Sequence, residues 1–141
     1  MTVTQNARPF EWPVRVYYED TDAQGVVYYA NYFRFMERAR TEWLRALGVD
    51  QVALINDERR IFVVVQTNAD FVEPARFNDQ IIVTARLTRL TRATFDIEQN
   101  IYLDSLDGKL LLRGGIRAAY LNADTMRPTR VPASIFEETK S

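Results

Sequence analysis

The pattern that most constrains the fold is a single long amphipathic helix, predicted over residues 30–47. Its apolar side chains recur at helical spacing and form one stripe, made of Tyr32, Phe35, Met36, Ala39, Trp43 and Leu47. We expect Asn31 to cap the start of this helix and Gly48 to end it. Because no second helix of similar length is predicted, the stripe has to pack on something other than a helix.

Alternating apolar residues predict strands on both sides of this helix. A strand over residues 14–18 precedes it, and four strands follow, over residues 61–71, 80–90, 94–103 and 109–122. Residues 50–60 contain either a short helix or a connection. The turn that ends in Asp107-Gly108 predicts a hairpin, and Gly114-Gly115 indicates a bulge or the close approach of another backbone or a ligand. Short links between consecutive strands predict an α+β fold with a mostly antiparallel sheet.

The length and charge limit the domain count and the partners. A chain of 141 residues is most simply one domain, here with a polar lead-in over residues 1–12 and an irregular tail from about residue 124. Eighteen basic and nineteen acidic side chains argue against nucleic acid as a partner. No apolar run reaches the ~20 residues that span a membrane, and the first residues lack the apolar core of a signal peptide. We therefore expect a cytoplasmic protein.

The chain contains no histidine and no cysteine. A Ser-His-Asp triad, a thiolate nucleophile and a metal site of histidine or thiolate ligands are therefore excluded. No other metal-ligand spacing is present, so we expect no metal and no cofactor. Acid–base chemistry would have to come from a carboxylate, a tyrosine, a lysine or water.

An acidic loop precedes the predicted helix. Glu19, Asp20 and Asp22 lie close together, and Gly25 is the residue on which the turn would pivot. A solvated acidic turn is the simplest interpretation, but the flanking residues 26–29 (VVYY) are too apolar for it. The loop also leads into a helix N-terminus, where free N–H groups favour negative charge and could stabilise an oxyanion. A carboxylate beside such donors suits acyl transfer.

Tyrosines and arginines supply further candidates. Tyr28 and Tyr32 are expected to pack in the core or an interface, whereas Tyr29 could line a substrate pocket. The arginines of the later strands and the tail form a charged sheet face, or together meet the phosphates of a nucleotide-like ligand. They are Arg86, Arg89, Arg92, Arg113, Arg117, Arg127 and Arg130.

Three stretches carry a resemblance to a known family: residues 14–28 (VRVYYEDTDAQGVVY), 30–32 (ANY) and 35–44 (FMERARTEWL). They resemble the hotdog-fold acyl-CoA thioesterases of the 4-hydroxybenzoyl-CoA thioesterase family, and within it the subgroup encoded with the bacterial Tol–Pal envelope system. Residues 71–79 (FVEPARFND) and 126–132 (MRPTRVP) resemble the same subgroup.

The resemblance implies a curved, five-stranded antiparallel sheet wrapped around one long central helix. It implies hydrolysis of short-chain or aromatic acyl-CoA to the free acid and CoA, without a metal. Asp22 would be the catalytic carboxylate, as nucleophile or as general base, and the backbone N–H of Tyr29 would polarise the thioester carbonyl. The substrate would be bound by Gly25, Val27, Tyr28, Asn31 and Tyr32, and the CoA phosphates by Arg89 and Arg92.

The resemblance also implies a homo-oligomer, in which two hotdog units pair, usually go on to a tetramer, and bind acyl-CoA across the subunit interface. Members of the subgroup usually carry histidine where this chain has Tyr29, and the 4-hydroxybenzoyl-CoA enzymes carry tyrosine there. The subgroup thus favours short aliphatic acyl groups, and Tyr29 favours aromatic ones. The alternative is a non-catalytic hotdog protein that binds acyl-CoA or acyl-carrier protein, or that contacts the envelope machinery.

Overall fold

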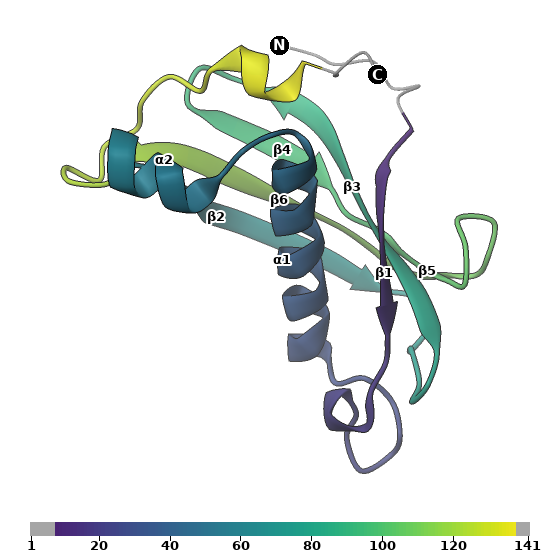
Figure 1. The fold of residues 1–141 in the computed structure, drawn as a ribbon. Helices are drawn as coiled ribbons and strands as arrows, with labels where there is room; N and C mark the ends of the chain where they lie inside the picture. The colour runs from purple at the N-terminus through teal and green to yellow at the C-terminus, as the bar shows by residue number, and fades with distance from the viewer. Residues whose placement is uncertain (1–7, 138–141) are drawn as a thin grey trace.

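The computed structural model of this chain describes residues 8–137. One antiparallel sheet of six strands curves around a long helix (Figure 1). In chain order the elements are β1 (Phe10–Arg15), η1 (Tyr18–Asp20), α1 (Tyr29–Ala46), α2 (Gln51–Glu58), β2 (Arg60–Phe71), β3 (Gln80–Leu90), β4 (Thr94–Glu98), β5 (Ile101–Leu103), β6 (Leu110–Asn122) and η2 (Ala133–Phe136). The predicted α+β class, with an antiparallel sheet around one long central helix, is confirmed.

Helix α1 buries the stripe that its sequence predicts. Five of the six side chains are fully buried and the sixth is partly buried: Tyr32, Phe35, Met36, Ala39, Trp43 and, at the end, Leu47. The helix packs on β1 and β3, while the shorter α2 packs on β2. Full burial of a large apolar side chain stabilises a fold by about 1.5–3 kcal/mol, so the stripe fixes α1 on the sheet.

The two ends of α1 differ in how well the sequence predicts them. Gly48 ends the helix as expected: its φ is 95°, and its N–H donates to the Arg45 carbonyl at 3.0 Å. The start was predicted too late, because Tyr28 is the N-cap and Asn31 lies inside the first turn. The side chain of Asn31 is used for a contact with the preceding loop, which is described below.

The first strand lies earlier in the chain than predicted. It begins at Phe10 and ends at Arg15, and it pairs along its whole length with β3. Pro13 is tolerated inside it because β1 is an edge strand, where a missing N–H costs no ladder bond. Residues 18–20, which were expected to continue or follow that strand, form the short helix η1 instead.

The sheet has six strands rather than five, because the strand predicted over residues 94–103 is divided into β4 and β5. The break falls at Gln99 and Asn100. The side chain of Gln99 is completely buried and donates to the Met36 carbonyl of α1 at 2.9 Å, so the interruption serves a contact between sheet and helix.

The structure tests two predictions for β6: the hairpin turn before the strand and the role of Gly114 and Gly115. The turn that ends in Asp107-Gly108 joins β5 and β6, which confirms the hairpin. Pairing with β2 continues in register through Gly114 and Gly115, so neither forms a bulge. A Cβ at Gly114 would lie 2.9 Å from the Asn68 carbonyl oxygen, so the close approach of a neighbouring backbone explains the glycine.

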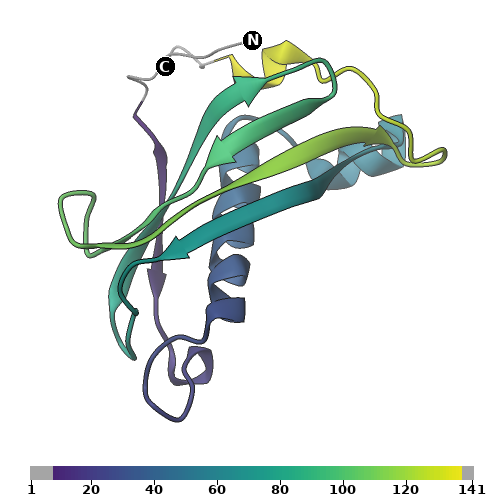
Figure 2. The same cartoon turned by 180° about the vertical axis from the view of Figure 1, so that it is seen from behind.

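The chain after β6 closes one end of the sheet. Val131 is buried, and its N–H donates to the Arg92 carbonyl at 2.8 Å. Phe136 in η2 stacks on Trp43 at 5.6 Å and meets Phe95 at 4.9 Å between ring centroids. The view from behind shows η2 at one end of the sheet and the loop that precedes α1 at the other (Figure 2). No helix within residues 8–137 is long and apolar enough to cross a membrane.

We expect Phe136→Ala to lower the free energy of unfolding by about 2–4 kcal/mol, because it removes a large ring that fills the end of the core. Phe77→Ala is the control, since Phe77 is 53% exposed, and it should cost less than about 1 kcal/mol. Urea denaturation of the three proteins measures both changes. Equal losses in the two variants would mean that η2 adds nothing to the core.

Candidate active site

The loop before α1 is a tight turn that is held on both sides. The N–H of Asp22 donates to the Val26 carbonyl at 2.9 Å, and the N–H of Gly25 donates to the Asp22 carbonyl at 2.9 Å. Gly25 has a φ of 79°, which confirms it as the pivot. The N–H of Val27 donates to the Ala75 carbonyl at 2.9 Å, and this bond attaches the loop to the connection between β2 and β3.

The carboxylate of Asp22 is exposed and only lightly engaged. One oxygen, Oδ1, accepts a hydrogen bond from the Gln24 N–H at 2.8 Å. Among residues 8–137 the other oxygen has no hydrogen bond, and no lysine or arginine forms an ion pair with this carboxylate. The turn therefore orients the group and leaves one oxygen available.

The first turn of α1 supplies unpaired donors beside this loop. Tyr28 at the N-cap provides no side-chain acceptor, and the first turn contains no acidic residue. In the described part of the chain the N–H groups of Tyr29 and Ala30 have no acceptor, whereas that of Asn31 donates to the Tyr28 carbonyl at 2.9 Å. These free donors lie at the positive end of the helix dipole and suit a carbonyl oxygen or an oxyanion.

A partly buried side-chain contact fixes the loop on the helix. Asn31 is 3% exposed, and its Nδ2 donates to Asp20 Oδ1 at 2.7 Å. The other oxygen of Asp20 accepts from the Tyr17 N–H at 2.8 Å. Asp20 is therefore a structural residue that fixes the position of Asp22 relative to α1, and the sequence did not indicate this role. The predicted contact of Asn31 with substrate stays a prediction.

An apolar cavity of about 190 Å³ opens beside the first turn of α1. It is lined by residues of the loop, the helix and the end of β2: Val27, Tyr29, Tyr32, Phe71, Val72, Glu73 and Pro74. The ring of Phe71 lies 5.6 Å from the rings of both Tyr29 and Tyr32. No role was predicted for Phe71 or Glu73, although both lie in the stretch over residues 71–79 that carries the resemblance.

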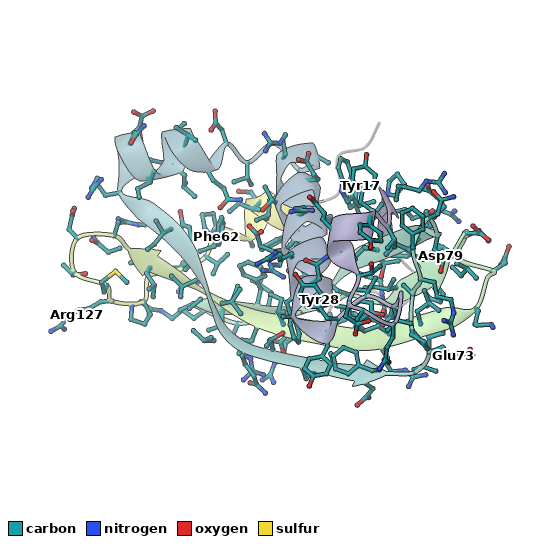
Figure 3. The ribbon with its side chains drawn as sticks, turned by 90° about the horizontal axis from the view of Figure 1, so that it is seen from below. Tyr17, Tyr28, Phe62, Glu73, Asp79 and Arg127 are labelled. Carbon is teal, nitrogen blue, oxygen red and sulfur yellow. The ribbon has the colours of Figure 1, made fainter. Side chains whose placement is uncertain are left out.

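The three tyrosines of this region differ in their surroundings. Tyr29 is 71% exposed and Tyr28 is 37% exposed. Tyr28 lies at the N-terminal end of α1 (Figure 3), outside the core of the single chain, and its packing in an interface stays a prediction. Tyr32 is buried, and its hydroxyl accepts from the Ala75 N–H at 2.9 Å. Burial raises the pKa of Tyr32, so this hydroxyl stays protonated at neutral pH.

Of the predicted loop and helix residues, the structure places Val27, Tyr29 and Tyr32 around one cavity, at a distance from the predicted phosphate contacts. Arg89 and Arg92 are exposed at the turn between β3 and β4. Strand β3 begins next to the loop and has 11 residues, so these arginines lie about 35 Å away along it. Within one chain they cannot serve the site at Asp22, and the prediction applies only to a site that another chain completes.

Sequence comparison identifies relatives over nearly the whole chain. Residues 24–107 match the family model described as thioesterase superfamily. The acyl-CoA thioesterase YbgC of Haemophilus influenzae is 37% identical over 126 residues, which cover 89% of this chain and 90% of that protein. The acyl-CoA thioester hydrolase YbgC of Escherichia coli O157:H7 is 39% identical over 135 residues, which cover 96% and 98%.

Solved structures agree with this match. A probable thioesterase from Bartonella henselae has a TM-score of 0.81 and 33% identity, and the match covers 89% of this chain and all of that one. A mutant of 4-hydroxybenzoyl CoA thioesterase complexed with 4-hydroxybenzoyl CoA has a TM-score of 0.84, 21% identity and coverage of 92% and 96%, and it supports the fold alone. From its sequence and its hotdog fold, the chain belongs to the thioesterase superfamily.

Proposed function

We propose that this chain hydrolyses acyl-CoA thioesters, with the Asp22 carboxylate and the Tyr29 backbone N–H as the reacting groups. One observation carries the proposal: a carboxylate with a free oxygen lies in the loop that runs directly into a helix whose first N–H groups have no acceptor. The relatives named acyl-CoA thioesterase and acyl-CoA thioester hydrolase support the same activity.

In the proposed reaction the thioester carbonyl oxygen accepts a hydrogen bond from Tyr29 N–H, and the charge that forms on that oxygen is stabilised by the positive end of α1. In one route Asp22 attacks the carbonyl carbon, the C–S bond breaks, CoA leaves as the thiolate, and water hydrolyses the acyl–aspartyl anhydride. In the other route Asp22 takes a proton from the attacking water and passes it to the departing sulfur. In both routes the contact between Asn31 and Asp20 would keep the Asp22 carboxylate at a fixed position relative to the Tyr29 N–H.

We propose that the acyl group enters the apolar cavity next to Tyr29. The rings of Tyr29, Tyr32 and Phe71 surround this space, and its volume of about 190 Å³ suits a short aliphatic chain or one aromatic ring. Because Tyr29 is exposed at the mouth of the cavity, we expect it to contact the acyl group directly.

We further propose that the site is completed by a second copy of the chain. Strand β2 is an edge strand, and it exposes Val64, Val65 and Phe71. A 12-residue edge strand with three exposed apolar side chains is suited to pairing with another strand. Pairing there would cover the open side of the cavity at Phe71. A dimer, and beyond it a tetramer, would also allow Arg89 and Arg92 of another copy to approach the CoA phosphates.

The proposed location is the cytoplasm, where acyl-CoA is formed and consumed. We also propose a connection with the Tol–Pal envelope system, which rests on the resemblance of this chain to the subgroup encoded with that system. Contact with acyl-carrier protein belongs to the same proposal, since such a carrier presents an acyl thioester on the same phosphopantetheine arm.

The alternative function is a non-catalytic protein that holds an acyl thioester. The observation that favours it is the exposed Tyr29 in the position where members of the subgroup usually carry histidine. A panel of acetyl-, butyryl-, hexanoyl-, palmitoyl- and 4-hydroxybenzoyl-CoA separates the two functions. Thiol release from at least one of them supports the enzyme, whereas binding of the panel without any thiol release supports the carrier.

We expect Asp22→Asn to lower kcat for the best substrate of that panel by about a hundredfold or more, because the amide neither attacks nor takes a proton. The matched control is Asp104→Asn, which changes an exposed aspartate in the turn after β5 and should leave kcat unchanged. Thiol release measures the rate, and circular dichroism checks that both variants are folded. Turnover by the Asp22 variant at the parent rate would remove Asp22 from the mechanism.

We expect Val65→Lys to weaken self-association, because it places a charge on the exposed edge that would pair with the second copy. Val65 is 56% exposed in the single chain. Val52→Lys is the control, since Val52 is 68% exposed and belongs to α2 rather than to β2. Light scattering after size-exclusion chromatography gives the mass of each protein, and a parent protein that elutes as a monomer would contradict the proposed dimer.

A further inference from the structure

The cavity beside Tyr29 has a single buried polar side chain among its lining residues. Three of these residues have polar side chains: Tyr29, Tyr32 and Glu73. Tyr29 is 71% exposed at the mouth, and Glu73 forms an exposed ion pair with Lys109 at 3.3 Å. Tyr32, in contrast, is only 3% exposed. Its hydroxyl is therefore the polar group that a ligand inside the cavity would meet.

The hydroxyl oxygen of Tyr32 is held in place as an acceptor. It accepts a hydrogen bond from the Ala75 N–H at 2.9 Å, and the Ala75 carbonyl accepts one from the Val27 N–H at 2.9 Å. Val27 and Pro74, which directly precedes Ala75, both line the cavity. These contacts place the hydroxyl at the wall of the cavity, where the connection between β2 and β3 meets the loop before α1.

The proton of this hydroxyl has no acceptor within the single chain. A tyrosine hydroxyl donates one hydrogen bond in addition to accepting, and burial raises the pKa of Tyr32, so the proton is present at neutral pH. Among residues 8–137 no hydrogen bond has this hydroxyl as its donor. Because an O–H group in apolar surroundings costs free energy unless it donates, a ligand oxygen at this position would be stabilising.

A second cavity, of about 180 Å³, lies further along α1 and has a different polar lining. Its polar residues include Glu37, Arg40 and Gln51, and Arg40 donates from Nη1 to Gln99 Oε1 at 2.9 Å. In the described part of the chain the two cavities have no lining residue in common. The donor at Tyr32 therefore acts on the part of a ligand that lies next to the candidate active site.

Tyr32 lies close to the proposed position of the thioester. It follows Tyr29 by one turn of α1, a rise of about 4.5 Å, and helical side chains lean toward the N-terminus. In the proposed reaction the thioester carbonyl oxygen lies at the Tyr29 N–H. The first carbons of the acyl group would then lie beside Phe71, whose ring is 5.6 Å from the rings of both tyrosines. An oxygen on the third carbon can therefore reach the Tyr32 hydroxyl.

We propose that Tyr32 is a specificity-determining residue, which donates a hydrogen bond to an oxygen on the acyl group. The substrate class is then short acyl-CoA thioesters with a keto or hydroxyl oxygen on the third carbon, in preference to plain alkyl ones. A plain alkyl chain leaves the O–H group without an acceptor, whereas an oxygenated chain replaces its hydrogen bond to water with one to Tyr32. This inference rests on the proposed thioesterase function and adds a substrate class for the same cavity.

The test compares acetoacetyl-CoA with butyryl-CoA, which have the same number of carbons and differ in the keto oxygen. We expect the parent protein to have the higher kcat/KM for acetoacetyl-CoA. Tyr32→Phe should lower that value by about ten- to a hundredfold and the value for butyryl-CoA by much less. The two thioesters differ in intrinsic reactivity, so the quantity compared between variants is the ratio of the two kcat/KM values. Tyr120→Phe is the control, since Tyr120 is also 3% exposed, and it should keep the ratio of the parent.

Binding to Asp22→Asn, measured by calorimetry, tests the same contact with Tyr32 intact. We expect this variant to bind acetoacetyl-CoA more tightly than butyryl-CoA, and Tyr32→Phe in the same background to remove the difference. Equal binding of the two thioesters by Asp22→Asn would overturn the contact, even if Tyr32→Phe does not fold.

The outcomes for this inference and for the proposed function are distinguishable. Tighter binding of acetoacetyl-CoA by a parent protein that releases no thiol from either thioester would overturn hydrolysis and support the contact. Turnover with a ratio that Tyr32→Phe leaves unchanged would overturn the contact alone. In that case an equal loss for both thioesters would mean that the hydroxyl only supports the loop through Ala75.

Discussion

The apolar stripe of α1 has to be buried by strands, because the only other α-helix in residues 8–137, α2, is short and packs on β2. An antiparallel sheet can do this only by curving around the helix, and β1 and β3 supply the side against which α1 packs. The ends of the helix then acquire different environments. Its C-terminal part is covered by Phe136 of η2, and its N-terminus is left beside the loop that carries Asp22.

That N-terminus determines the chemistry available to the chain. In the absence of histidine and cysteine, a carboxylate and backbone N–H groups are the natural means of activating a thioester. The structure provides both within one rigid unit, because Asp20 and Asn31 tie the loop to the first turn. Two neighbouring aspartates thus have different roles: Asp20 accepts hydrogen bonds from Asn31 and Tyr17, and Asp22 keeps an oxygen free.

The packing of α1 on β1 and β3 also leaves space toward β2. Two cavities lie there, one beside Tyr29 and one beside Arg40, and their walls come from α1 and β2 in both cases. Gln99 connects this space to the core, since its buried amide bonds to the backbone of α1 and of β3 and receives Arg40. The same break in the sheet that separates β4 from β5 therefore also determines where the positive charge of Arg40 lies.

The sequence by itself determined the fold class, the apolar face of α1, the end of that helix at Gly48 and the family, because each depends on local periodicity or on a contiguous motif. It also placed Asp22 and Gly25 in one loop and Tyr29 shortly after that loop. Only the tertiary structure decided that Asp20 locks to Asn31, that Phe71 faces Tyr29, that Arg89 and Arg92 lie far from Asp22, and that Gln99 orients Arg40. Most of these contacts join residues that are distant in the chain, and Asp20 could not be told from its acidic neighbours by sequence. The curvature of the sheet around α1 selects the partners, and no local pattern encodes that curvature.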